Sequence, residues 1–196
     1  MNTRIKTQTM VYYGMIIAII ILMSVVPFLG FIQIPPLAIT LVHIPVIIGA
    51  MLFGWRAGTL FGLVFGVSSL FVAMTRGAGA DVLFINPLIS VLPRIIFGAL
   101  VYPIYKFFEK VQASEGLAIG ITAFVASFVH SVLVLAMIYA VLNVQAQGGV
   151  FDNVIFQQVL AALLTVNVTL EAVVSTVIAL PLVKAIRRSM RNKLTN

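Results

Sequence analysis

The sequence contains no cysteine and little charge, and each shortage excludes a class of protein. Without cysteine there can be neither a disulfide framework nor a thiol site. Only 9% of the 196 residues are charged, whereas a soluble domain is about one quarter charged. Acidic residues are especially scarce, with five Asp and Glu against twelve Lys and Arg. Hydrophobic residues make up 62% of the chain, so we expect an integral membrane protein.

Motifs of catalysis are also missing. The sequence has no H-E-x-x-H pair, no G-x-S-x-G and no phosphate-binding P-loop. We therefore predict no enzymatic activity, no cofactor and no metal site. The basic residues lie mainly in short breaks between apolar runs and in the C-terminal tail, where membrane topology explains them without a nucleic-acid partner.

Apolar runs predict an all-α fold with six transmembrane helices in one domain, residues 1–196. Each crossing of a bilayer needs about 20 apolar residues, so the length leaves no room for a second domain. A kinked or half-buried second helix is expected, because that run is short and begins near His43-Ile44-Pro45. The six runs lie near residues 10–29, 42–55, 57–75, 84–108, 116–142 and 154–188.

Basic residues predict the orientation of these helices. They cluster at both termini and in the breaks that follow the second and fourth helices, while the other three connections carry only Arg76. The positive-inside rule therefore predicts that both termini are cytoplasmic. Segments 27–40, 76–84 and 143–153 would then face outward. The first is rich in proline and aromatic residues, which suits either a lid over a pocket or a solvated connection.

Small residues recur at four-residue spacing on two predicted helices. Gly58, Gly62 and Gly66 form one row, and Gly14 with Ala18 forms another. Such rows let helix backbones approach closely. We expect the first row to pack within the bundle. The second row either packs in the same way or receives a separate membrane protein.

Four ionisable residues fall inside predicted helices, where charge is costly and usually functional. They are His43, Arg94, His130 and Glu171. Counted from the cytoplasmic end of each helix at about 1.5 Å per residue, all four lie roughly 18–21 Å up. Because four helices place such groups at one level, the sequence predicts a shared site in the outer half of the membrane.

Further polar residues extend this site. Asn86 and Ser90 precede Arg94 at four-residue intervals, and Asn167 and Ser175 flank Glu171 in the same way. The two polar faces are expected to meet at a cavity that opens outward. Arginine binds a carboxylate through two parallel hydrogen bonds, and the amides supply donors and acceptors for hydroxyls. A small, polar, anionic ligand is therefore predicted.

Structural alternatives exist for the same residues. Arg94 and Glu171 could pair with each other and only stabilise the bundle. His130 lies beside Ser127 and Ser131, so it could be a hydrogen-bonded core residue. His43 is equally open to either interpretation.

Three stretches resemble the substrate-binding S components of energy-coupling factor (ECF) transporters, most closely the pantothenate-specific type. They are residues 39–70 with "HIPVIIGA", residues 86–100 with "NPLISVLPR" and residues 167–186 with "NVTLEA". The resemblance implies a six-helix vitamin-binding subunit in a bacterial plasma membrane. It also implies two kinds of partner, a transmembrane coupling protein of the EcfT type and two cytoplasmic ATPases of the EcfA type.

The resemblance also assigns roles to residues. It implies that Gly14 and Ala18 form the docking motif for the coupling protein, although members of the family usually have alanine at both positions. Pantothenate suits the predicted site, because it offers a carboxylate to Arg94 together with an amide and two hydroxyls. Folate and biotin also carry carboxylates and remain alternatives. So does a proton-coupled or facilitative carrier that acts alone.

Overall fold

The computed structural model describes residues 3–26, 29–34, 37–76, 79–111, 114–145 and 168–195. Within these ranges the chain forms long helices, a short 3-10 helix and one small hairpin. The elements are α1 (Thr3–Val25), β1 (Phe31–Ile34), β2 (Leu37–Thr40), α2 (His43–Phe53), α3 (Trp55–Arg76), η1 (Gly79–Ile85), α4 (Pro87–Ser90), α5 (Leu92–Val111), α6 (Glu115–Gln145) and α8 (Val168–Thr195).

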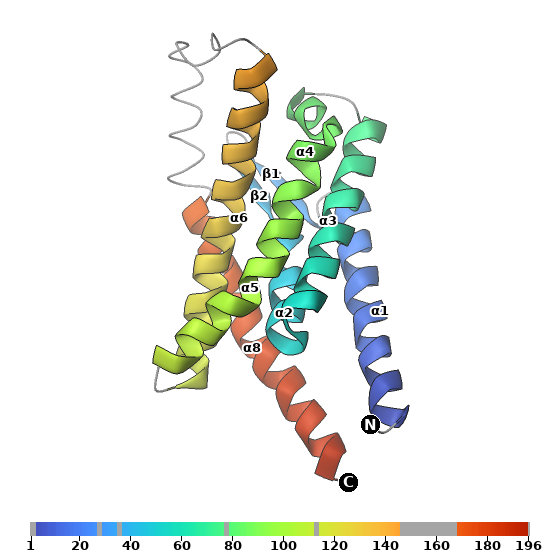
Figure 1. Ribbon diagram of the computed structural model, residues 1–196, viewed down its shortest axis with the longest axis vertical. Helices are drawn as coiled ribbons and strands as arrows, with labels where there is room; N and C mark the ends of the chain where they lie inside the picture. Colours follow the sequence, from blue (N-terminus) through green and yellow to red (C-terminus); the bar gives the residue numbers. More distant parts are fainter. Residues whose placement is uncertain are drawn as a thin grey trace.

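Five helical segments in the described ranges are long and apolar enough to cross a membrane. They are α1, α3, α4 together with α5, α6, and α8. Figure 1 shows them as an elongated bundle whose two chain ends lie at the same end of the molecule. The chain is therefore an all-α, multi-pass membrane protein, as the composition predicts.

The short helix α2 lies inside this bundle. Every residue from His43 to Met51 is buried, so α2 is neither half-buried nor exposed to lipid on one side. Gly54 ends α2 with φ of 92°, a conformation that residues with a Cβ rarely adopt. This single residue lets α3 begin at once, at Trp55.

The ends of several helices differ from the prediction. α1 begins and ends earlier than the predicted range 10–29, because polar residues such as Thr7 and Gln8 continue the helix before the apolar run. α8 continues to Thr195 instead of residue 188. The first half of the predicted helix 154–188, up to residue 167, lies outside the described residues.

The predicted helix 84–108 is not continuous. Its first residues belong to the 3-10 helix η1 and to α4, and α5 begins only at Leu92. Two prolines explain the interruption. Pro87 sits at the start of α4, where its missing N–H costs nothing, and Pro93 prevents a regular helical hydrogen bond across the junction at Val91.

The predicted outer segment 27–40 contains the antiparallel hairpin of β1 and β2. Phe31 pairs with Thr40, and Ile34 pairs with Leu37. β-Branched and aromatic residues favour strands, and the sequences FIQI and LAIT are rich in them. The backbone N–H of Leu41 donates to the carbonyl of Gly30 at 2.8 Å and extends the pairing to the start of α2.

Glycines on α3 let α5 approach very closely. A Cβ added to Gly62 would collide with the backbone carbonyl of Arg94, and one added to Gly58 would collide with the carbonyl of Gly98. A Cβ on Gly66 would lie 2.7 Å from the Cα of Val91. The prediction that this row packs within the bundle is confirmed, and the contact fixes the backbone that carries Arg94.

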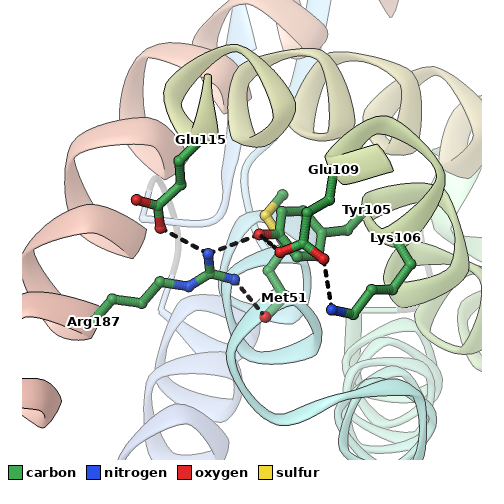
Figure 2. A network of polar contacts seen from close by, with 6 residues as sticks. All are labelled: Met51, Tyr105, Lys106, Glu109, Glu115 and Arg187. Atoms are coloured by element: carbon green, nitrogen blue, oxygen red, sulfur yellow. Dashed lines mark hydrogen bonds and ion pairs between the residues drawn. The ribbon is translucent and has the colours of Figure 1, made fainter. Parts of the chain in front are cut away.

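Arg187 joins four helices near the end of the bundle that holds the termini (Figure 2). Its guanidinium donates to the hydroxyl of Tyr105 at 2.7 Å, to Glu115 at 2.8 Å and to the carbonyl of Met51 at 3.1 Å. The Tyr105 hydroxyl donates in turn to Glu109 at 2.7 Å. α2, α5, α6 and α8 are thus held together by one arginine.

Candidate functional site

Buried serines and a histidine connect α2, α6 and α8 in the interior. His43, the first residue of α2, is fully buried. Its Nε2 lies 2.9 Å from the hydroxyl oxygen of Ser127 on α6 and 2.8 Å from that of Ser175 on α8. The hydroxyl of Ser175 also donates to the carbonyl of Glu171, one turn earlier. This network fixes the His43 ring.

Glu171 uses both of its carboxylate oxygens within the protein. Oε1 accepts a hydrogen bond from the backbone N–H of Thr40 at 2.6 Å, and Oε2 accepts one from the Ser131 hydroxyl at 3.2 Å. Thr40 ends the hairpin, so Glu171 ties the hairpin to α8 and α6. The side chain is only 5% exposed.

Arg94 does not pair with Glu171. Within the described part of the chain neither residue takes part in an ion pair. The guanidinium of Arg94 donates instead to the carbonyl of Ile89 at 2.5 Å. That carbonyl is available because the residue four positions later is Pro93, which has no N–H to donate. The hypothesis of a structural Arg94–Glu171 pair is therefore wrong.

The rest of the Arg94 side chain lies among aromatic rings. Its guanidinium carbon is 5.0 Å from the ring centre of Phe84 and 5.5 Å from that of Phe65. The residue is only 4% exposed, and its Nε has no hydrogen-bond partner among the described residues. Aromatic faces attract a cation but do not neutralise it. Arg94 thus presents a buried positive charge that no carboxylate of the described residues neutralises.

His130 stacks on His43 and completes the aromatic surroundings. The two imidazole rings are 5.0 Å apart at an angle of 9°. Phe97 contacts the His130 ring edge-on at 5.0 Å, and Phe65 contacts it at 5.7 Å. Phe65 therefore touches both Arg94 and His130. The structure brings the four predicted ionisable groups into one region, linked by serines and aromatic rings.

Asn86 and Ser90 do not form a continuous helical face with Arg94. Asn86 precedes α4 and caps it, since its Oδ1 accepts from the backbone N–H of Leu88 at 2.9 Å. The hydroxyl of buried Ser90 donates to the Asn86 carbonyl at 3.1 Å. The junction at Val91 separates both from the helix of Arg94. Asn167 lies outside the described residues, so its predicted place in the site stays a prediction.

Sequence reasoning gave too little weight to several residues of this region. Ser127 and Ser131 were noted only as neighbours of His130, yet they bind His43 and Glu171. Ser127 precedes His130 by three residues and Ser131 by four, so helical spacing places Ser127 beside both, which is the signal that identifies the two serines. Phe65 and Phe97 carry no such signal, because aromatic residues are common throughout apolar helices.

Gly14 and Ala18 lie on an exposed face of α1. A Cβ added to Gly14 would meet no described atom within 4 Å, so this part of the helix does not pack against the described bundle. Both residues are exposed, in contrast to the buried glycines of α3. Of the two alternatives for this row, packing within the bundle is therefore excluded for the described residues.

Comparison with known proteins gives a consistent result. Residues 8–186 match the family described as "ECF transporter, substrate-specific component". The chain is 28% identical over 171 residues to the pantothenic acid transporter PanT of Lactococcus lactis subsp. cremoris, covering 80% of this chain and 82% of that protein. It is 32% identical over 101 residues to the pantothenate transporter PanT of Leuconostoc mesenteroides subsp. mesenteroides, covering 49% and 50%. With the family match extending over nearly its whole length, this multi-pass membrane protein belongs to the substrate-specific components of ECF transporters.

Proposed function

We propose that this chain captures pantothenate outside the cell and delivers it inward with an ECF module, which comprises an EcfT-type coupling protein and two EcfA-type ATPases. Family membership supports the transport role. The names of two relatives, both pantothenate transporters, support the choice of vitamin. The structural observation that carries the proposal is the buried guanidinium of Arg94, which has no acidic partner among the described residues.

A buried arginine inside a membrane protein requires a counter-charge, because its desolvation is costly. The Ile89 carbonyl satisfies one N–H and supplies only a partial charge. A ligand carboxylate would supply a full charge and could accept two hydrogen bonds from the guanidinium. Glu171 does not compete for this position, since its oxygens are held by Thr40 and Ser131.

The surroundings of Arg94 suit the other parts of pantothenate. The molecule has an amide, two hydroxyls and a dimethyl group besides its carboxylate. Polar contacts would come from hydroxyls and imidazoles of the buried cluster, and the dimethyl group would pack on aromatic rings such as Phe65 and Phe97. The proposed contact set consists of Arg94, Asn86, Ser90, Asn167, Glu171, His43 and His130.

The exposed face of α1 supports the second part of the proposal. Gly14 and Ala18 form a strip of small residues on the apolar part of α1, and such strips allow close approach of another helix. The proposed occupant is the coupling protein. The proposed orientation places both termini, with the basic end of the bundle, in the cytoplasm.

The vitamin assignment is tested by titrating the purified chain with a panel of vitamins in a calorimeter. We expect pantothenate to bind more tightly than biotin, folate, riboflavin or thiamine. Pantothenol, which has an alcohol in place of the carboxylate, should bind much more weakly. If pantothenol binds as tightly as pantothenate, Arg94 does not bind a carboxylate. A clear preference for biotin or folate would keep the site and change the vitamin.

Reconstitution separates the proposed role from that of an independent carrier. Proteoliposomes that contain only this chain should bind pantothenate without accumulating it. Adding the coupling protein, the ATPases and ATP should start uptake. Uptake by the chain alone, with or without a proton gradient, would contradict the proposal.

A further inference from the structure

Both ring nitrogens of His130 lack a hydrogen-bond partner among the described residues, although the side chain is only 4% exposed. Such a situation is uncommon, because buried polar groups in proteins are nearly always hydrogen-bonded. The Nε2 of the stacked neighbour His43 is hydrogen-bonded, as is usual for a buried polar atom, because it contacts two serine hydroxyls. Among the described residues, His130 therefore lacks the hydrogen bonds that a structural core role would predict.

The packing around His130 holds its ring in place. His43 stacks on one face with nearly parallel planes, and Phe97 meets the ring at 62°. Phe65 contacts it at an angle of 30°. With aromatic rings on these sides, a rotation of the imidazole towards Ser127 or Ser131 would break the contacts. The two nitrogens are fixed in position, buried and without a partner among the described residues.

His130 lies near enough to Arg94 for one small molecule to reach both. The Phe65 ring centre is 5.5 Å from the guanidinium carbon and 5.7 Å from the His130 ring centre. Because both distances are measured from the same ring centre, the guanidinium carbon and the His130 ring centre lie at most about 11 Å apart. An extended tripeptide spans roughly 10 Å. Pantothenate has about the length of such a tripeptide, with its carboxylate and its hydroxyls at opposite ends.

The chemistry of a neutral imidazole decides which end of the ligand it suits. One nitrogen donates a hydrogen bond and the other accepts one. A hydroxyl can likewise donate and accept, and two neighbouring hydroxyls can satisfy both nitrogens. A carboxylate only accepts, so it would leave the accepting nitrogen of His130 unpaired. Arg94, which only donates, suits the carboxylate better.

We propose that His130 is a specificity-determining residue that binds the hydroxyl-bearing end of the ligand whose carboxylate binds to Arg94. This inference rests on the proposed function and adds the orientation of the ligand in the site. The ligand would lie across Phe65, with its charged end towards α5 and its hydroxyls towards α6. Besides its place in the proposed contact set, the stacked His43 would hold His130 in position, because its serine contacts fix the ring on which His130 rests.

The test combines one variant with two altered ligands. His130→Phe keeps an aromatic ring for the stack and removes both nitrogens. The variant and the unmodified chain are each titrated with pantothenate, pantothenol and a dideoxy analogue. In the dideoxy analogue both hydroxyls of pantothenate are replaced by hydrogen. We expect His130→Phe to bind pantothenate about ten- to a hundredfold more weakly than the unmodified chain, as for loss of one or two buried hydrogen bonds. The dideoxy analogue should bind both chains within about twofold.

Pantothenol shows which end of the ligand His130 contacts. If His130 binds hydroxyls, the substitution should weaken pantothenol by the same factor as pantothenate. If His130→Phe lowered the affinity for the dideoxy analogue but not for pantothenol, His130 would contact the carboxylate. That result would overturn the inference. Equal affinity of His130→Phe and the unmodified chain for pantothenate would overturn it as well.

Two further measurements keep the test decisive. If His130→Phe does not fold, His130→Asn keeps a donor and an acceptor, and it should retain a preference for pantothenate over the dideoxy analogue. In the unmodified chain the dideoxy analogue must bind at least tenfold more weakly than pantothenate, and equal binding would refute the role of His130. Failure of the unmodified chain to bind pantothenate at all would instead refute the proposed function.

Discussion

Two arginines of this protein occupy opposite chemical situations. Arg187, at the end of the bundle that holds the termini, donates to a carboxylate, a hydroxyl and a carbonyl, and its guanidinium carbon lies 4.8 Å from the Tyr105 ring centre. Arg94 is more deeply buried, yet among the described residues it donates to a single carbonyl and its Nε has no partner. Within the described part of the chain, the more deeply buried arginine is the one with fewer partners.

This difference separates an arginine that stabilises the fold from one that we propose binds a ligand. Arg187 joins helices that meet at one point, and its ionic partner Glu115 is supplied by the chain (Figure 2). Arg94 is held by backbone features, namely the carbonyl freed by Pro93 and the close α3–α5 contact at Gly62. The described residues position the charge of Arg94 without neutralising it.

The largest expected effect is on ligand binding when Arg94 is removed. Arg94→Ala should weaken pantothenate binding by about 2–5 kcal/mol, the range for truncating one partner of a buried, hydrogen-bonded charge pair. Arg94→Lys should recover only part of the loss, because an ammonium cannot form the planar two-donor contact. Calorimetric titration measures both. Unchanged affinity in Arg94→Ala would show that the charge has another purpose.

The same site gives a second, opposite expectation for stability. Arg94→Met removes a buried charge that has no acidic partner among the described residues and keeps an unbranched side chain, so the ligand-free protein should unfold at an equal or higher temperature. Thermal unfolding in detergent checks this. A clear loss of stability would indicate that Arg94 holds the bundle together, as Arg187 does.

The next largest effect is expected where α3 meets the backbone of Arg94. Gly62→Ala would place a methyl group against the Arg94 carbonyl, and overpacking of this kind costs about 1–3 kcal/mol. Because the strain acts on α5 at Arg94, ligand affinity should fall together with the unfolding temperature. Gly120→Ala is the matched control, since its Cβ would make ordinary contacts of 3.4 Å with Leu180 and 3.6 Å with Thr176. Equal behaviour of the two variants would contradict this account of the α3–α5 contact.

A smaller effect is expected at Arg187, and on stability alone. Arg187→Met leaves the Met51 carbonyl, Tyr105 and Glu115 without their shared donor. Because the Glu115 side chain is 56% exposed, solvent screens the ion pair, and we expect a loss of about 1–2 kcal/mol in the free energy of unfolding. Pantothenate affinity in the folded fraction should not change. A loss of affinity as large as that of Arg94→Ala would remove the distinction between the two arginines.

The sequence predicts the membrane bundle and the level of the polar cluster because both follow from composition and helical spacing. His43, Arg94, His130 and Glu171 do meet in one region, as equal depth suggests. Which polar groups pair could not be predicted, since pairing depends on tertiary contacts. The Glu171 carboxylate binds the N–H of Thr40, a backbone group on a hairpin that helix periodicity does not reveal. The α4–α5 junction was in principle predictable from Pro87 and Pro93, whose effect on helix continuity is well defined.

The smallest effect on the isolated chain is expected on the exposed strip of α1. Gly14→Leu and Ala18→Leu add side chains that point away from the described bundle, so folding and pantothenate affinity should remain nearly unchanged. If a partner helix approaches this strip closely, each leucine should weaken assembly with the coupling protein by about tenfold.

A leucine substitution on another exposed face provides the control. Val67→Leu on α3 keeps an apolar side chain at an exposed position whose native side chain is already larger than that of glycine or alanine. Co-purification of the ECF module with each variant measures assembly, and titration in parallel measures binding. Parallel losses of assembly and vitamin binding would place the strip inside the fold. Because Gly14 and Ala18 lie on a helix that contributes none of the proposed ligand contacts, we expect assembly to fall while binding is retained.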